Sequence, residues 1–152
     1  MSPTERLYLA AGDPRGAMAL RIVVEGRGLP DRALLEAALA RAAGSCPGSR
    51  LVRDGATWVA AGPPPRVRLA PAVTAGPARR GERPGCELVV VRGADPDRTS
   101  LVFSASHAVM DGHGALTWVR EVFRALRGED PRPAHGRHTD QDVLRAHAAR
   151  AR

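Results

Sequence analysis

The sequence has 152 residues, of which 43% are hydrophobic and 26% are charged, and its formal net charge is +7. This length fits one domain with a buried core, and the hydrophobic content is too high for a disordered chain. All 23 basic residues are arginines scattered along the chain and aromatic residues make up only 3%, so we expect no specific nucleic-acid partner.

The first part of the chain predicts a strand, a helix and a short hairpin. Residues 17–25 are rich in β-branched residues and predict a strand. Pro30 and Asp31 open a helix, because proline suits a first turn and aspartate complements the N-terminal dipole. Apolar residues then recur at helical spacing until Gly44. The sequence RDGA at 53–56 predicts the tight turn of a hairpin.

The middle of the chain predicts two central strands. Residues 61–65 and 71–85 are loops rich in proline, glycine and arginine, and a short edge strand at 66–70 joins them. Residues 86–92 and 99–106 are almost continuous in apolar residues, which indicates central strands covered on at least one face. The short linker between these two strands predicts an antiparallel hairpin.

A long amphipathic helix follows over residues 113–127, and a weaker one over 140–151. The apolar stripe of the first helix comprises Leu116, Val119, Phe123 and Leu126, widened by Ala115, Trp118 and Val122. The order of elements predicts an α/β fold, a two-layer sandwich with a mixed, largely antiparallel sheet and helices on one face. We assign residues 1–130 to this lobe and 131–152 to a linker and terminal helix.

Membrane and secretion signals are not evident in the sequence. No stretch approaches the roughly 18 apolar residues that span a bilayer. The N-terminus lacks a charged region followed by an apolar one, so we expect a cytoplasmic protein with no membrane partner. Cys46 and Cys86 match no metal-ligand spacing and are too few for a disulfide scaffold.

The most informative stretch is LVFSASHAVMDGHG at 101–114, where a buried strand ends in His107. An imidazole at a strand end can face a cleft and take a proton from a hydroxyl, amine or thiol. A carboxylate such as Asp111 can orient it directly or by locking the turn. Gly112 can provide a positive φ and a close approach of the backbone to a ligand. These residues are therefore compatible with a catalytic base at His107, although the spacing alone does not select this interpretation.

Two other interpretations of the same residues remain open at this point. A histidine at a strand end is more often a satisfied structural residue than a base, and the motif His-x-x-x-Asp-Gly is short enough to match by chance. A metal site would use His107, Asp111 and His113, although these residues straddle a turn rather than sharing one face of a helix or strand.

The segment SHAVMDGHGALTWVREVFRAL resembles the active-site segment of the chloramphenicol-acetyltransferase-like superfamily. That superfamily includes the condensation domains of nonribosomal peptide synthetases, whose motif is His-His-x-x-x-Asp-Gly. The opening strand, the first helix, the turn CPGSRLV and the sequence LRGEDP are also similar to an N-terminal lobe of such domains. The resemblance covers about residues 5–130 in the family's order, and it implies a chloramphenicol-acetyltransferase-like single lobe.

The resemblance implies a role for each matching residue. His107 corresponds to the second, catalytic histidine, which acts as general base or positions the acceptor. Asp111 corresponds to a structural aspartate that forms a salt bridge to an arginine, here Arg50, and Gly112 to the motif glycine. Ser106 replaces the first histidine of the pair, and Ser106 and His113 are candidates for substrate contact. No resident metal or cofactor is implied.

The reaction implied by the resemblance is acyl transfer from a thioester to an amine or hydroxyl acceptor. The donor would be carried by coenzyme A or by a phosphopantetheinyl carrier protein. Condensation-type enzymes resemble two such lobes with a cleft between them, so a second lobe, a second subunit or self-association would complete the site. The alternative is a catalytically inactive lobe that serves as a binding or docking module.

Overall fold

The computed structural model describes most of the chain. The described residues are 3–10, 19–28, 30–71, 85–93, 95, 97–133 and 140–150.

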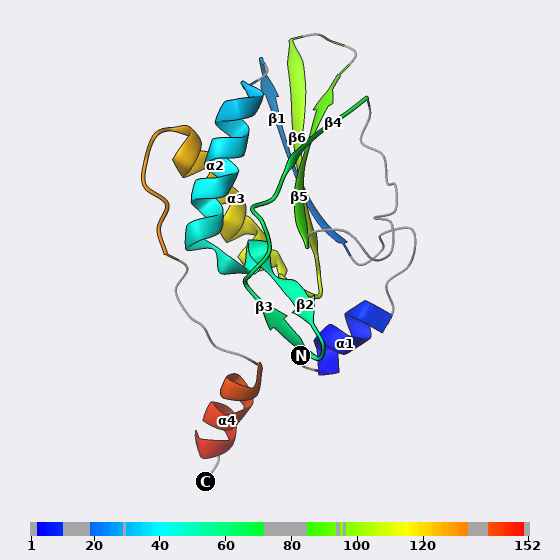
Figure 1. Ribbon diagram of the computed structural model, residues 1–152, viewed down its shortest axis with the longest axis vertical. Helices are drawn as coiled ribbons and strands as arrows, with labels where there is room; N and C mark the ends of the chain where they lie inside the picture. The colour runs from blue at the N-terminus through cyan, green and yellow to red at the C-terminus, as the bar shows by residue number, and fades with distance from the viewer. Residues whose placement is uncertain are drawn as a thin grey trace.

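A four-stranded sheet forms one layer of the molecule (Figure 1). Its strands lie in the order β1 (Ala19–Arg27), β6 (Arg98–Ser106), β5 (Cys86–Arg92) and β4 (Val67–Ala70). The β1–β6 and β6–β5 pairs are antiparallel, whereas β5 and β4 are parallel. The predicted mixed, largely antiparallel sheet is therefore confirmed, with the two most apolar strands at its centre.

Helices α2 (Arg32–Ser45) and α3 (Gly112–Leu126) form the second layer and lie on the same side of the sheet (Figure 1). Leu39 of α2, Leu88 of β5 and Trp118 of α3 are almost fully buried in one core cluster. Phe103 of β6 meets Trp118 edge-on, with ring centroids 5.5 Å apart. The predicted two-layer α/β sandwich is confirmed.

Local sequence signals account for the boundaries of α2 and the hairpin that follows it. Asp31 is the N-cap of α2, and its carboxylate accepts hydrogen bonds from the backbone N–H groups of Ala33 and Leu34. After the short 3-10 helix η1 (Pro47–Arg50), strands β2 (Val52–Asp54) and β3 (Thr57–Val59) pair in an antiparallel hairpin. Gly55 in their turn has a φ of +57°, which explains the RDGA signal.

The buried face of α3 differs from the predicted stripe. Leu116 is 46% exposed, so its placement in the stripe was wrong. The buried face instead comprises Ala115, Trp118, Val119, Glu121, Val122 and Ala125. The buried face includes Trp118, a large side chain that is 1% exposed and packs against Phe103 of β6, and the carboxylate of Glu121 is buried on the same face.

Two further helices lie at the ends of the described chain. Helix α1 (Pro3–Ala10) was not predicted, whereas α4 (Asp140–Arg150) lies within the predicted 140–151. None of the helices in the described ranges is long and apolar enough to cross a membrane. The assignment of 131–152 to a linker and terminal helix stays a prediction.

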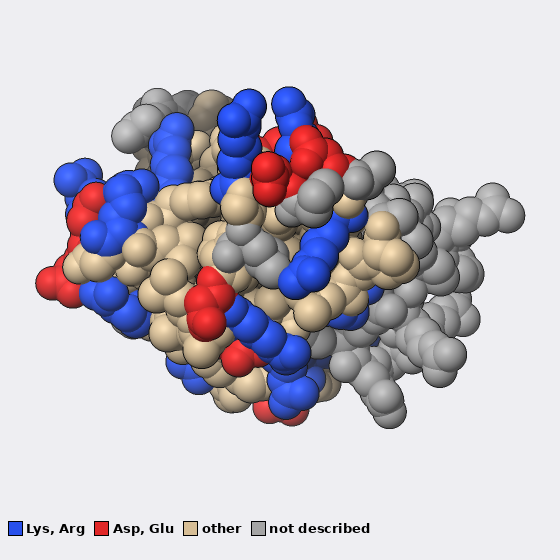
Figure 2. Space-filling view, turned by 90° about the horizontal axis from the view of Figure 1, so that it is seen from above, with Lys and Arg blue, Asp and Glu red and all other residues tan. Residues whose placement is uncertain are grey.

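Charges of both signs are mixed on the face shown in Figure 2, where arginines and carboxylates alternate among uncharged residues. Several arginines pair with acidic neighbours, for example Arg32 with Glu36 at 2.8 Å and Arg68 with Glu87 at 3.5 Å. Although the whole chain has a net charge of +7, the described arginines on this face therefore do not form one continuous basic surface.

Candidate functional site

Strand β6 carries His107 to the end of the sheet, as the sequence predicted. The strand ends at Ser106, whose carbonyl oxygen accepts hydrogen bonds from the N–H groups of Val109 and Met110. Helix α3 begins at Gly112, so a short turn separates the strand from the helix. This turn holds the His107 backbone between two regular elements, and its side chain is half-buried.

Asp111 caps α3 instead of pairing with an arginine. Its side chain is exposed, and Oδ1 accepts a hydrogen bond of 2.7 Å from the N–H of Gly114. Its carbonyl oxygen accepts the first helical bond, from Ala115. The inward-facing salt bridge to Arg50 that the resemblance implied is not formed in the described structure. An aspartate directly before the first helical residue is a strong N-cap, and this local bond takes the place of the expected pair.

Arg50 has a different structural role, at the end of η1. Its Nε donates a hydrogen bond of 2.8 Å to the carbonyl oxygen of Gly62, and the N–H of Gly62 donates one of 3.0 Å to the carbonyl oxygen of Arg50. These two bonds tie the segment after β3 back to η1. Both of these bonds join Arg50 to Gly62, and among the described residues Arg50 forms no hydrogen bond or ion pair with His107 or Asp111.

The glycine required by the turn is Gly114 rather than Gly112. Gly112 has an ordinary helical φ, so the expected positive φ is wrong, and a Cβ placed there would have no atom within 4 Å. A Cβ at Gly114 would lie 2.9 Å from Cγ of Met110 and 3.2 Å from Oδ1 of Asp111. Gly114 therefore allows the capping carboxylate and Met110 to approach the first turn of α3.

The two residues predicted to contact substrate differ in their surroundings. The hydroxyl of Ser106 accepts a hydrogen bond of 3.3 Å from the N–H of Ala108, so it stabilises the turn locally. His113 is exposed in the first turn of α3, and its carbonyl oxygen accepts a bond from the hydroxyl of Thr117. Contact of either residue with a substrate stays a prediction.

Tyr8 of α1 is a residue of the site that the sequence did not reveal. Its ring stacks on the imidazole of His107, with centroids 4.4 Å apart and the planes inclined by 28°. An aromatic pair of this kind contributes about 0.5–1.5 kcal/mol beyond its buried area. The two residues are 99 positions apart in the numbering, so only the tertiary fold brings them together.

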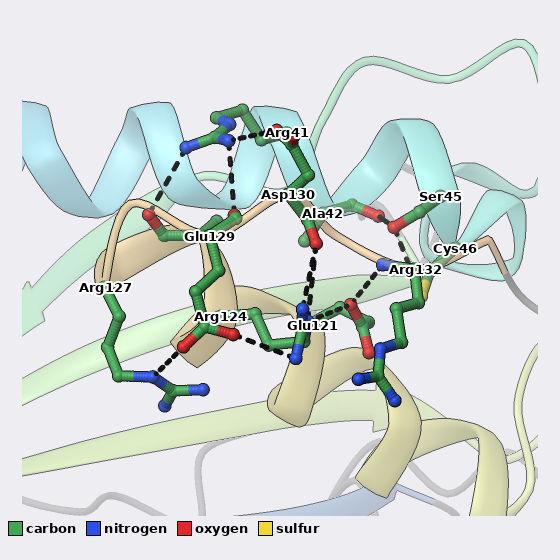
Figure 3. A network of polar contacts seen from close by, with 11 residues as sticks. Arg41, Ala42, Ser45, Cys46, Glu121, Arg124, Arg127, Glu129, Asp130 and Arg132 are labelled. Atoms are coloured by element: carbon green, nitrogen blue, oxygen red, sulfur yellow. Dashed lines mark hydrogen bonds and ion pairs between the residues drawn. The ribbon is translucent and has the colours of Figure 1, made fainter.

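A separate polar cluster lies where α3 ends (Figure 3). Arg124 contacts Glu121 at 3.5 Å and Glu129 at 2.9 Å, and Arg127 contacts Glu129 at 2.7 Å. From α2, Arg41 reaches Asp130 at 3.0 Å and the carbonyl oxygen of Glu129 at 3.2 Å. This cluster joins the exit of α3 to α2, so its role is architectural.

The surroundings of this cluster shift the pKa of two groups. The hydrogen bond from Arg127, with other nearby arginines, lowers the pKa of Glu129. Burial raises the pKa of the Cys46 thiol, and Ser45 partly opposes this effect. The second thiol, Cys86, lies in the sheet, and burial raises its pKa to about 12. Both cysteines are free and buried, so neither is an activated nucleophile at neutral pH.

An open groove of about 650 Å³ lies between β1 and the C-terminal half of α3. Val24, Phe123 and Arg120 are among its lining residues, and none of the predicted site residues lines it. The groove therefore does not supply the cleft that chemistry at His107 would need.

The proposed metal ligands do not form a metal site among the described residues. No group of three histidine, cysteine, aspartate or glutamate side chains is close enough to hold an ion in this part of the chain. Asp111, one of the three residues considered, uses its carboxylate to cap α3.

The comparisons with known proteins bear on the fold. No protein-family profile and no curated protein matches this sequence. Solved structures nevertheless share the architecture, which is a condensation-domain lobe of the chloramphenicol-acetyltransferase-like fold.

Three of these structures illustrate the likeness. The starter condensation domain of rhizomide synthetase, crystallised as a variant, has a TM-score of 0.69 at 16% identity, over 98% of this chain and 43% of its own. The first condensation domain of the calcium-dependent antibiotic synthetase has a TM-score of 0.65 at 20% identity, over 100% of this chain and 43% of its own. The X-domain from teicoplanin biosynthesis has a TM-score of 0.64 at 17% identity, over 97% and 37%. The chain thus spans less than half the length of each.

Proposed function

We propose that the chain is an acyl-transfer lobe. His107 acts as the general base when an acyl group is transferred from a thioester to an amine or hydroxyl. The observation that carries the proposal is a half-buried imidazole at the end of a central strand, in a fold shared with condensation domains. Among the described residues, no hydrogen bond or ion pair engages this imidazole. Its ring nitrogens are therefore available to a substrate.

In the proposed reaction, His107 accepts a proton from the acceptor as its nitrogen or oxygen attacks the thioester carbonyl carbon. The carbonyl becomes a tetrahedral oxyanion, and its collapse breaks the C–S bond. The imidazolium then returns the proton to the departing thiolate. The donor would be an acyl group on coenzyme A or on a phosphopantetheinyl carrier protein, and the chain itself needs no resident metal for these steps.

A second lobe or subunit would complete the site. The chain covers 43% of the rhizomide synthetase domain. In the described sheet, β1 pairs with β6 alone and is an edge strand, and Val23 at its middle is 48% exposed. A nine-residue edge strand without proline can accept a further strand. A complementary lobe or a second copy of the chain could therefore extend the sheet and add a wall opposite His107.

The test is release of free thiol from an acyl-coenzyme A and from an acyl-carrier protein, with a panel of amines and alcohols as acceptors. The chain is assayed alone and with a complementing lobe, and its oligomeric state is measured in parallel. His107→Ala should lower turnover by about 10²–10⁴-fold in a protein that remains folded, with a stability loss of only about 0.5–1.5 kcal/mol from the missing stack on Tyr8. His147→Ala, at an exposed histidine of α4 away from the site residues, is the matched control and should retain turnover. Full turnover in His107→Ala would contradict the proposed role.

The alternative is a catalytically inactive lobe that binds a partner protein. The X-domain of teicoplanin biosynthesis, in its complex with OxyB, superposes on 95% of this chain with a TM-score of 0.66. This likeness supports the idea that the fold can dock a partner protein. No thiol release with any donor, together with a stable complex between this chain and a carrier protein, would favour the docking lobe.

A further inference from the structure

We infer that Tyr8 is a positioning residue that holds the imidazole of His107 by stacking on one of its faces. This inference rests on the proposed function of His107 for its catalytic consequence, but the orientation itself can be measured without turnover. Its basis is the 4.4 Å stack between the two rings, inclined by 28°.

The stack replaces the hydrogen bond that usually orients a histidine. The carboxylate of Asp111 is bonded to Gly114 and the guanidinium of Arg50 to Gly62, so neither orients His107 in the described structure. Within the described part of the chain, the aromatic ring that contacts the imidazole is that of Tyr8. Stacking on the face of Tyr8 therefore orients the imidazole of His107 in this site.

Stacking has a chemical advantage over a hydrogen bond for a general base. The lone pair of a neutral imidazole nitrogen lies in the plane of the ring, whereas Tyr8 lies against its face. The contact therefore restrains the ring without competing for the nitrogen that takes the proton. It also closes one face of the ring, so donor and acceptor must approach the ring edge or the opposite face.

The placement of α1 indicates that this contact is specific. Leu7 is 63% exposed on α1, whereas the neighbouring Tyr8 is half-buried against His107. Figure 1 shows α1 beside the end of the sheet where β6 terminates. The helix thus presents its aromatic residue to the body of the molecule and leaves a large apolar residue in solvent.

The first experiment is proton NMR of the full chain with labelled histidines. Tyr8 is the only tyrosine and His107 one of five histidines, so a ring-current effect can be assigned. The imidazole protons of His107 should lie upfield in the wild type, move to ordinary positions in Tyr8→Ala and stay upfield in Tyr8→Phe. Leu7→Ala is the control on the same helix, and the signals of His113 should not change.

The Hα–Hβ couplings of His107 report its orientation directly. They should indicate one rotamer in the wild type and in Tyr8→Phe, and rotamer averaging in Tyr8→Ala. Unchanged couplings in Tyr8→Ala, or no upfield shift in the wild type, would overturn the positioning role whatever the turnover assay gives.

The second experiment applies where thiol release is measurable. Tyr8→Ala should lower kcat about tenfold with little change in KM, because a misoriented base slows proton transfer rather than binding. Tyr8→Phe should restore kcat. An unchanged kcat in Tyr8→Ala would overturn the catalytic consequence, whereas full activity in His107→Ala would refute the proposed function itself.

Discussion

At the N-terminal end of α3, charged and polar side chains have few partners, whereas at its C-terminal end almost every charge is paired. Among the contacts between described residues, Asp111 bonds to its own helix and His107 stacks on an aromatic ring. Near the other end of the same helix, Arg124 contacts Glu121 and Glu129, as Figure 3 shows.

Under the proposed function, this difference separates the contacts that hold α3 in place from the residues that take part in the reaction. Paired and partly buried charges fix the position of the helix end against α2, because breaking them leaves desolvated groups unsatisfied. At the other end, the imidazole of His107 forms no hydrogen bond or ion pair with the described residues, so under the proposed function it can meet a substrate without first breaking such a contact. Under the proposed function, the end with fewer paired charges is the one that meets the substrate, and variants at both ends test this contrast.

The largest effect should come from the paired end. Glu121 is 7% exposed, and its carboxylate accepts a 2.6 Å hydrogen bond from the N–H of Arg132. Glu121→Ala should lower the free energy of unfolding by about 2–3 kcal/mol, because this N–H and Arg124 each lose a partner. Glu121→Gln keeps an acceptor oxygen and should cost about half as much. Urea denaturation measures both, and a cost below about 0.5 kcal/mol for Glu121→Ala would contradict the architectural role.

The buried thiol under the site should make stability depend on alkaline pH. The pKa of Cys86 is raised from 9.0 to about 12 by burial, so the unfolded chain loses this proton first as the pH rises. The stabilisation is complete below pH 9 and is lost as the pH approaches 12. Between pH 8 and 10 the unfolding free energy should fall by about 1.4 kcal/mol from this group. Cys86→Ala should show a shallower fall, and an equal fall would exclude the thiol as its cause.

A smaller effect is expected from the N-cap of α3. Asp111→Ala should destabilise the protein by about 1 kcal/mol, because it removes the acceptor for the N–H of Gly114. Asp111→Asn keeps a capping oxygen and should cost only a few tenths of that amount. Thermal unfolding distinguishes the two. A loss of about 3–5 kcal/mol would instead indicate a buried ion pair.

The smallest effect is the coupling between Arg50 and Asp111. Because the two side chains bond to different backbone groups, the costs of Arg50→Ala and Asp111→Ala should add within about 0.5 kcal/mol in a double-mutant cycle. The pair Glu121 and Arg124, in contact at 3.5 Å, is the control that should show coupling. A large Arg50–Asp111 coupling would mean that the two groups meet in solution.

The sheet and the main helices could be predicted because their signals are local. The continuous apolar run at 86–92 coincides with β5, and Asp31 caps α2. Leu116 was misplaced because periodicity defines a stripe only to within one position, and the packing of Trp118 then decides which side is buried. Helix α1 has only eight residues, too few for a periodic signal.

The candidate site was only partly predictable for the same reason. The position of His107 at the end of a strand follows from the apolar run before it. Tyr8 could not be found, because no local pattern connects residues from the two ends of the chain. The Arg50–Asp111 pair that the resemblance implied was wrong. An aspartate at a helix start instead bonds to the third helical N–H, here that of Gly114.

The pairing of β1 with β6 has a consequence during synthesis. Val23 lies opposite Val102, so the two strands are made roughly 80 residues apart. At about 5–20 residues per second, β1 emerges from the ribosome several seconds before its partner. An unpaired apolar strand is open to association during that interval, whereas the β5–β6 hairpin closes as soon as it is made. In the nascent chain, β1 therefore stays unpaired until β6 has been made. A pause of the ribosome after β1 should lengthen this interval and increase the recruitment of chaperones to the nascent chain.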